Sequence, residues 1–225
     1  MKTEYLLFNL IVIAGPVALS FDRRVHFISD WTRAFLAVLS ASFPFIIWDI
    51  LVTGRHWWFN PEYTLGFKLA GLPFEEWLFF ITVPFACIFI WQVLGAYFPD
   101  IKYQITRSLS IAAAALIIAG IVSAYYGLEY TAISALLLGG IIILDSYLGC
   151  SVLTSRRGLT LFAIVTILML IFNGYLTSRP VVIYDPQYQL NFRILTIPVE
   201  DFLFGYAHIL LTLFMFVKFR RSANA

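Results

Sequence analysis

Seven apolar stretches, most of them long enough to cross a lipid bilayer, limit most strongly what this chain can fold into. A transmembrane helix needs roughly 20 mainly apolar residues to span the hydrocarbon core. Only 12% of the residues are charged, whereas charged residues make up about a quarter of an ordinary soluble domain. The sequence therefore predicts an all-α membrane protein with seven transmembrane helices, in one integral membrane domain over residues 1–225. The predicted helices fall within residues 5–21, 34–54, 77–99, 108–128, 130–148, 158–178 and 202–217.

A pair of adjacent acids behind a proline occurs twice in the chain. The segment Pro73-Phe74-Glu75-Glu76 returns 125 residues later as Pro198-Val199-Glu200-Asp201. The loop before it repeats at the same spacing, because residues 59–63 (Phe-Asn-Pro-Glu-Tyr) correspond to residues 184–188 (Tyr-Asp-Pro-Gln-Tyr). The sequence therefore predicts a duplicated unit.

The seven helices divide into two repeats of three helices and one connecting helix. Repeat 1 covers about residues 4–98, the connecting helix about residues 107–128, and repeat 2 about residues 130–219. Both repeats then run in the same direction, as parallel repeats about an axis along the membrane normal. Both acidic pairs would open towards the same side of the membrane.

The positions of lysine and arginine predict the orientation in the membrane. Short cytoplasmic loops hold an excess of these residues. Ten of the fifteen Lys and Arg residues lie after the first, third, fifth and seventh predicted helices. We therefore expect a multi-pass protein of the cell membrane with its N-terminus outside and its C-terminus in the cytoplasm. The acidic pairs would lie towards the outer side.

The acidic pairs have a structural and a functional interpretation. Proline followed by acids is a common start of a helix, since carboxylates interact well with the N-terminal end of the helix dipole. However, acids are costly in membrane segments, and here they are duplicated among aromatic neighbours. In a parallel repeat, Glu75 and Glu200 could face one cavity, where burial and repulsion between like charges favour the protonated form of at least one. A neutral carboxylic acid can donate a proton.

Other polar residues at membrane depth are mainly expected to be structural. His208 lies two helical turns after Asp201 and on about the same face of its helix. Asp145 requires either a buried partner or a role in a site. The many aromatic residues, 22 of them phenylalanine, would suit a site for a cationic or polyene ligand.

Several classes of function lack their motifs in this sequence. It contains no dinucleotide-binding glycine motif, no P-loop, no zinc-protease motif and no pair of aspartate-rich diphosphate motifs. Its two cysteines have no metal-ligand spacing. No basic run with interleaved aromatics indicates binding to nucleic acid. The classes of function that remain are acid–base chemistry on an apolar molecule and movement of an ion.

The repeated motifs resemble those of the membrane-embedded, non-flavin lycopene cyclases in their fused two-repeat form. The resemblance rests on residues 58–66, on the segment Leu72-Pro73-Phe74-Glu75-Glu76, and on the second copy that ends Pro198-Val199-Glu200-Asp201. It covers nearly the whole chain. The loops differ at Phe59-Asn60-Pro61 and Tyr184-Asp185-Pro186, so the two halves need not be chemically equivalent.

The resemblance implies an enzyme of carotenoid biosynthesis, a lycopene β-cyclase that makes β-carotene via γ-carotene. Ring closure adds a proton at C2 of lycopene and removes one from C6, with no net redox change, no cofactor and no metal. Glu75 and Glu200 would be proton donor and acceptor, in either order, with Glu76 and Asp201 tuning them. The expected substrate-binding residues are Trp48, Asp49, Asn60, Tyr63, Trp77, Phe79, Asp185, Tyr188, Phe204 and His208.

The expected partners are lycopene and related acyclic carotenoids within the lipid bilayer, and association into homo-oligomers or with other carotenoid enzymes is open. A small proton-coupled transporter is the alternative function. It would need a polar path across the membrane, whereas the acids gather at one face. The type of ring, and whether one or both ends are closed, also stay open.

Overall fold

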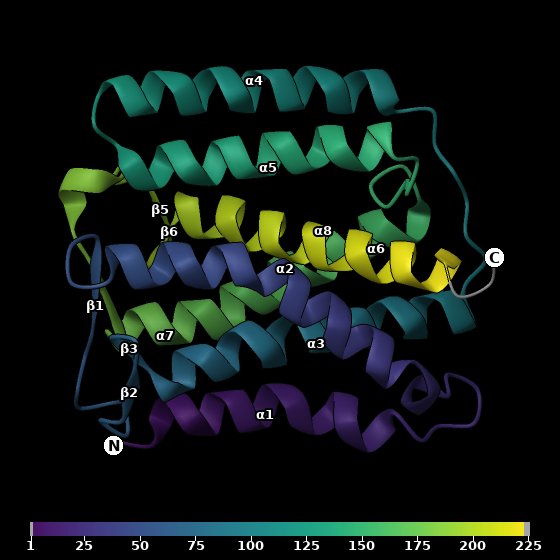
Figure 1. The fold of residues 1–225 in the computed structure, drawn as a ribbon, viewed down its shortest axis with the longest axis horizontal. Helices are drawn as coiled ribbons and strands as arrows, with labels where there is room; N and C mark the ends of the chain where they lie inside the picture. Colours follow the sequence, from purple (N-terminus) through teal and green to yellow (C-terminus); the bar gives the residue numbers. More distant parts are fainter. Residues whose placement is uncertain (1, 223–225) are drawn as a thin grey trace.

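The computed structural model describes residues 2–222, which form a bundle of antiparallel helices (Figure 1). The first and the last described residues lie at opposite ends of the bundle. The helices are α1 (Glu4–Leu19), η1 (Phe27–Asp30), α2 (Trp31–Val52), α3 (Phe74–Tyr97), α4 (Thr106–Tyr125), α5 (Glu129–Tyr147), α6 (Arg156–Leu168), η2 (Met169–Asn173), α7 (Gly174–Ser178), η3 (Pro186–Tyr188) and α8 (Val199–Ser222). The helix α6 continues through the π-helical turn η2 into α7, so these three form one long helix.

Six of the helical segments within residues 2–222 are long and apolar enough to cross a membrane. They are Phe27–Val52, Phe74–Tyr97, Thr106–Tyr125, Glu129–Tyr147, Arg156–Ser178 and Val199–Arg220. The helix α1 has only 16 residues, which is ~24 Å at 1.5 Å per residue, less than the ~30 Å of a hydrocarbon core. The membrane class is therefore confirmed. The predicted count of seven spanning helices is not confirmed, because six helices within residues 2–222 have spanning length and α1 is shorter.

Short strands, which an all-α prediction did not include, join the two halves of the chain. The strand β1 (Trp57–Phe59) pairs antiparallel with β4 (Val182–Tyr184), and the central pair is Trp58 with Ile183. Because Ile183 follows Trp58 by 125 residues, corresponding positions of the two repeats meet across this pairing. The two-stranded β1–β4 ribbon therefore has a local two-fold symmetry that relates the two repeats.

A two-residue hairpin precedes each acidic helix. It is formed by β2 (Lys68–Leu69) with β3 (Leu72–Pro73), and by β5 (Arg193–Ile194) with β6 (Ile197–Pro198). Each hairpin ends at a proline, which precedes the first helical residue and has no backbone N–H to leave unpaired. The helices α3 and α8 consequently begin at Phe74 and Val199, and both acidic pairs lie in a first turn. The acids thus lie at the favourable end of each helix dipole.

The centre of the bundle is formed by α2, α3, α5 and α8. Fully buried side chains include Phe45 of α2, Phe85 and Ile88 of α3, and Leu210 of α8. The helix α4 packs against α5 at the edge of the bundle (Figure 1), and only 17% of its most apolar stretch is buried.

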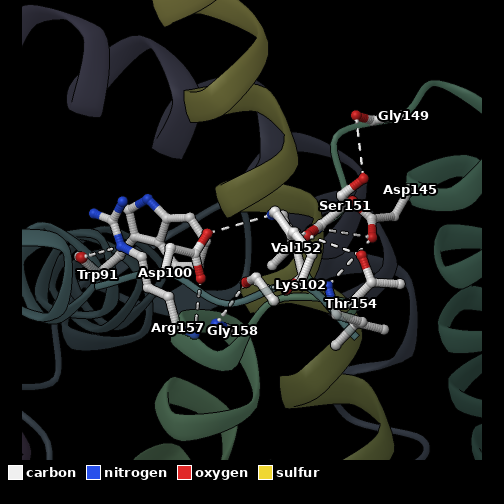
Figure 2. A network of polar contacts seen from close by, with 12 residues as sticks. Trp91, Asp100, Lys102, Asp145, Gly149, Ser151, Val152, Thr154, Arg157 and Gly158 are labelled. Carbon is white, nitrogen blue, oxygen red and sulfur yellow. Dashed lines mark hydrogen bonds and ion pairs between the residues drawn. The ribbon is translucent and has the colours of Figure 1, made fainter. Parts of the chain in front are cut away.

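Asp145 is a structural residue at the end of the bundle that carries the C-terminus. Its carboxylate accepts backbone hydrogen bonds from Val152 at 3.1 and 3.2 Å and from Leu153 at 3.4 Å (Figure 2). These bonds tie the loop between α5 and α6 to the end of α5. The backbone of this loop is therefore one buried partner of Asp145.

Candidate functional site: a cavity between the two repeats

A cavity of about 370 Å³ runs between α1, α3, α6 and α8 and ends at the β1–β4 ribbon. This volume lies within the usual range for small-molecule sites. Most of its wall is apolar or aromatic. Most of its polar wall residues gather near the starts of α3 and α8, and they are Tyr5, Asp49, Glu76, Tyr130, Asn173, Tyr184 and Asp201. His208 lies farther along α8.

Only the second acid of each pair lines this cavity. Glu76 and Asp201 are wall residues, whereas Glu75 and Glu200 are fully buried behind the wall. Successive residues of an α-helix point about 100° apart, since the helix has 3.6 residues per turn. The expectation that Glu75 and Glu200 share a cavity thus differs from the structure, which brings Glu76 and Asp201 there instead.

The first acid of each pair holds the loop that precedes its own helix. One oxygen of Glu75 accepts a hydrogen bond from the backbone N–H of Leu65 at 2.6 Å. In the second repeat, Glu200 accepts one from the N–H of Leu190 at 2.8 Å and another from the Thr131 hydroxyl at 2.6 Å. The contacts to Leu65 and Leu190 correspond under the 125-residue repeat. This repetition indicates a role in positioning the hairpins.

Asp201 accepts hydrogen bonds from three side chains. The hydroxyls of Tyr130 and Tyr184 donate at 2.7 Å, and the amide of Asn173 donates at 2.9 Å. Burial and the nearby Asp201 carboxylate raise the pKa of Tyr184 well above its ordinary value, so this phenol keeps its proton and remains a donor. Burial disfavours the ionised form of Asp201, and the three donors offset part of that cost because they stabilise a carboxylate. Asp201 is therefore suited to be a carboxylate that can accept a proton.

Glu76 has a different set of partners. It accepts a hydrogen bond from the hydroxyl of Tyr5 and shares a further one with the carboxyl group of Asp49. Asp49 also accepts hydrogen bonds from the indole N–H of Trp57 at 2.8 Å and from the hydroxyl of Thr53 at 3.0 Å. Two carboxyl groups can share a hydrogen bond only if one of them is protonated. The Asp49–Glu76 pair is therefore suited to hold a proton.

The two acids have corresponding but unequal surroundings. Tyr5 bonds Glu76 as Tyr130 bonds Asp201, and both steps between repeats are 125 residues. However, Asn173 stands beside Asp201 where Asp49 stands beside Glu76. In addition, Tyr184 has Phe59 as its counterpart, which has no hydroxyl to donate. One side of the cavity is consequently suited to hold a proton between two carboxyl groups, and the other is suited to hold a carboxylate among donors.

Four of the expected substrate-binding residues lie in the cavity wall, and these are Asp49, Phe79, Phe204 and His208. The imidazole of His208 is buried between the rings of Phe45 and Phe80 and shares a 2.8 Å hydrogen bond with the hydroxyl of Ser42. His208 thus forms part of the wall and is held by a partner from another helix.

The other six expected residues do not line the cavity. Trp77 is half-buried and donates its indole N–H to the backbone oxygen of Leu69 at 3.1 Å. Asn60 and Asp185 each accept a backbone N–H two residues on, and so stabilise their own turns. The remaining three, Tyr63, Tyr188 and Trp48, belong to aromatic or cation–π contacts nearby.

The arginines of the repeated loops pair across the two repeats. Arg179 of repeat 2 contacts Glu4 at 3.2 Å, and Arg55 of repeat 1 forms a salt bridge with Glu129. Glu129 also lies 3.1 Å from His56. Burial, followed by the charge of Arg55, lowers the pKa of His56 from its ordinary value. These contacts lock the ends of the two repeats together beside the cavity.

The sequence reasoning missed the donors that surround the acids, chiefly Tyr5, Tyr130, Trp57 and Tyr184. The 125-residue step could have found the pair Tyr5 and Tyr130, because it also relates Glu76 to Asp201. Within residues 2–222, no group of three or more His, Cys, Asp or Glu side chains is placed to hold a metal ion.

Comparison with known families supports the internal repeat. The sequence model of the lycopene cyclase family matches the chain twice, at residues 2–94 and at residues 127–219. The second match begins and ends 125 residues after the first. No curated protein and no solved structure matches the chain. Because the two family matches together cover most of the sequence, the chain belongs to the lycopene cyclase family, in a form with two fused repeats.

Proposed function

We propose that this protein is a lycopene β-cyclase of the cell membrane, which converts lycopene to β-carotene via γ-carotene. The observation that carries the proposal is the placement of Glu76 and Asp201, one from each repeat, in the wall of a single apolar cavity. Their partners suit one of them to donate a proton and the other to accept one. Cyclisation of a polyene end without net redox change requires this pair of functions.

The reaction begins with the proton held by Asp49 and Glu76. Glu76 donates it to C2 of an acyclic end, which leaves a cation at C1. The C5–C6 alkene attacks C1 and moves the positive charge to C5. Asp201 then accepts the proton from C6, and the C5–C6 double bond forms again within a β-ring. One proton enters and one leaves, so no oxidant or reductant is needed.

The aromatic wall would stabilise the cation and exclude water. Phe79, Phe80 and Phe204 line the cavity beside the acids, and the faces of aromatic rings attract positive charge. Few polar atoms other than those of the acid networks are present to hold a water molecule, which could otherwise add to the cation and give an alcohol. Glu75 and Glu200 act as positioning residues, because they fix the loops that lead into the two acidic helices.

Lycopene would enter from the lipid, between α1 and α6. Ile11 and Leu19 of α1 line the cavity and yet are 55% and 57% exposed, so the cavity reaches the apolar side of the bundle there. The acids would lie towards the outer side of the membrane, with the C-terminus in the cytoplasm. Both repeats of one chain supply the cavity, so the proposed reaction does not require a second copy. A proton-coupled transporter would need polar groups along the whole path, whereas they gather here at one end.

Expression in a bacterium that accumulates lycopene tests the proposal. We expect β-carotene to form, with γ-carotene as an earlier product, when pigments are separated by chromatography and identified by mass spectrometry and NMR. Products with ε-rings or γ-rings would correct the type of ring. Unchanged lycopene, with the protein present in the membrane at a normal level, would contradict cyclase activity.

A further inference from the structure

A second cavity lies at the opposite end of the bundle from the acids. Its volume is about 270 Å³, and it lies between the C-terminal halves of α3 and α8 and the start of α6. Arg220 follows Asp201 by 19 residues of α8, which places the two ends ~28 Å apart along the helix. The proposed reaction therefore does not involve this cavity. Its wall is formed by Trp91, Lys102, Cys150, Arg157, Phe216, Val217 and Arg220.

Two guanidinium groups converge beside this cavity on one neutral oxygen. The side-chain oxygen of Gln92 accepts hydrogen bonds from Arg157 at 2.9 Å and from Arg220 at 3.2 Å. Gln92 is itself buried and fixed, because its amide donates to Asp30 at 2.6 Å. The structure thus holds two positive charges close together without placing a negative charge between them.

Arg157 is held in place independently of any ligand. Its guanidinium lies over the ring of Trp91, 4.0 Å from the ring centre, and its Nε–H donates to the backbone oxygen of Trp91 at 2.6 Å (Figure 2). Close approach to α3 is possible because residue 95 is glycine, where a Cβ atom would lie only 2.4 Å from the guanidinium carbon. The guanidinium is therefore pre-organised.

The positive charge of this cavity is only partly balanced. Lys102 lies 3.4 Å from Asp100 and donates to the backbone oxygen of Ser151 (Figure 2). Asp100 also accepts a hydrogen bond from the backbone N–H of Arg157, at 3.3 Å. Within residues 2–222, neither Arg157 nor Arg220 forms a salt bridge. Three cations thus meet the carboxylate of Asp100 here, while the nearby carboxylate of Asp30, on the far side of Gln92, is paired with Arg33.

We propose that this cavity binds the phosphate of an anionic phospholipid at the membrane surface. Guanidinium groups match phosphate oxygens in geometry and bind them with charge-assisted hydrogen bonds. Basic pockets between transmembrane helices are suited to anionic lipid head groups. Phe216 and Val217 add apolar surface beside the cations, which suits the first part of an acyl chain. A phosphate here would relieve the repulsion between Arg157 and Arg220.

Native mass spectrometry of the purified full chain tests this site. We expect the delipidated protein to bind added phosphatidylglycerol at least about tenfold more tightly than phosphatidylcholine. Both lipids carry a phosphate, but the choline cation of phosphatidylcholine cancels its charge, whereas each Lys or Arg beside an anionic lipid contributes about 1 kcal/mol. Arg220→Gln should lose most of this preference. Lys102→Gln serves as a second variant, since the side chains of Lys102 and Arg220 both lie outside the buried core.

Arg107→Gln is the matched control. It removes the same charge at the same end of the bundle, but Arg107 lies outside the cavity wall. The preference should survive in this control. Equal binding of the two lipids, or an equal loss in Arg107→Gln and Arg220→Gln, would overturn the proposal. Inorganic phosphate is added as a separate competitor, and displacement of phosphatidylglycerol by it at equal concentration would assign the site to free phosphate and likewise refute a lipid site.

Discussion

Which acid of each pair exchanges protons with the substrate can be decided by four single variants. These are Glu75→Gln, Glu76→Gln, Glu200→Gln and Asp201→Asn, and each keeps the shape of a carboxyl group while removing its ability to exchange a proton. The structure predicts that the two variants at the cavity wall lose cyclisation and that the two behind the wall largely keep it.

The expected magnitudes follow from the contacts. A positioned general acid or base contributes about 10²–10⁴-fold to the rate, so Glu76→Gln and Asp201→Asn should each lower kcat by about that factor. In Glu75→Gln, the amide oxygen can still accept the 2.6 Å hydrogen bond from Leu65 N–H. What is lost is the charge assistance of one hydrogen bond, about 1 kcal/mol, which changes a rate by about fivefold if all of it reaches the transition state.

The assay measures initial rates with lycopene in detergent micelles or vesicles, normalised to the amount of folded protein in the membrane. Rates at several lycopene concentrations separate kcat from KM, because a displaced loop would act mainly through KM. The reasoning fails if Glu75→Gln and Glu200→Gln lose two orders of magnitude in kcat while Glu76→Gln and Asp201→Asn remain near the parental rate. Glu75 and Glu200 would then be the donor and acceptor, as the motif alone suggested.

Asp49→Asn, which copies the amide found beside Asp201, should remove the proton shared with Glu76 and lower kcat by about 10-fold or more. Thr53→Val removes only a donor to Asp49 and should have a smaller effect on kcat. Equal effects of the two variants would argue against proton sharing. Tyr130→Phe and Tyr184→Phe each remove one of three donors to Asp201. Each variant should slow cyclisation by about 10-fold, because a hydrogen bond to a charged group contributes ~1.5 kcal/mol. Unchanged rates in both variants would exclude Asp201 as the base. Turnover in deuterium oxide should place one deuterium at C2 of each new ring, because carboxyl protons exchange with water, and unlabelled carotene would mean that the proton moves within the substrate. Because burial lowers the pKa of His56, the folded state binds fewer protons at this residue than the unfolded state does. Thermal stability should therefore fall as the pH drops below about 6.5. His56→Gln should flatten this pH dependence, and an unchanged dependence would assign it to other groups.

Much of the architecture could be predicted because it depends on local or periodic features. Long apolar stretches determine membrane helices, since an unpaired backbone group in lipid is costly. The six helices of spanning length overlap six of the seven predicted stretches. The helix at the remaining predicted stretch, α1, ends at Leu19 and is too short to span a membrane. The duplication was equally visible, because it needs only a comparison of the sequence with itself.

The partners of the acids were outside the reach of sequence reasoning. Tyr5 and Glu76 are separated by 71 residues, as are Tyr130 and Asp201. Asp49 meets Glu76 only because α2 packs against α3. Such contacts depend on how each helix is rotated about its axis, and the acidic helices have little amphipathic pattern from which a rotation could be inferred.

The sequence by itself determined that this is a membrane protein of two repeats, that each repeat carries two acids, and that the motifs resemble those of lycopene cyclases. Hydropathy and repetition suffice for this, because both are properties of the chain before it folds. Only the tertiary structure decided that Glu76 and Asp201 face the cavity while Glu75 and Glu200 hold loops. The physical reason is that adjacent helical residues point about 100° apart, so packing against the other helices selects which of two neighbouring acids meets the cavity.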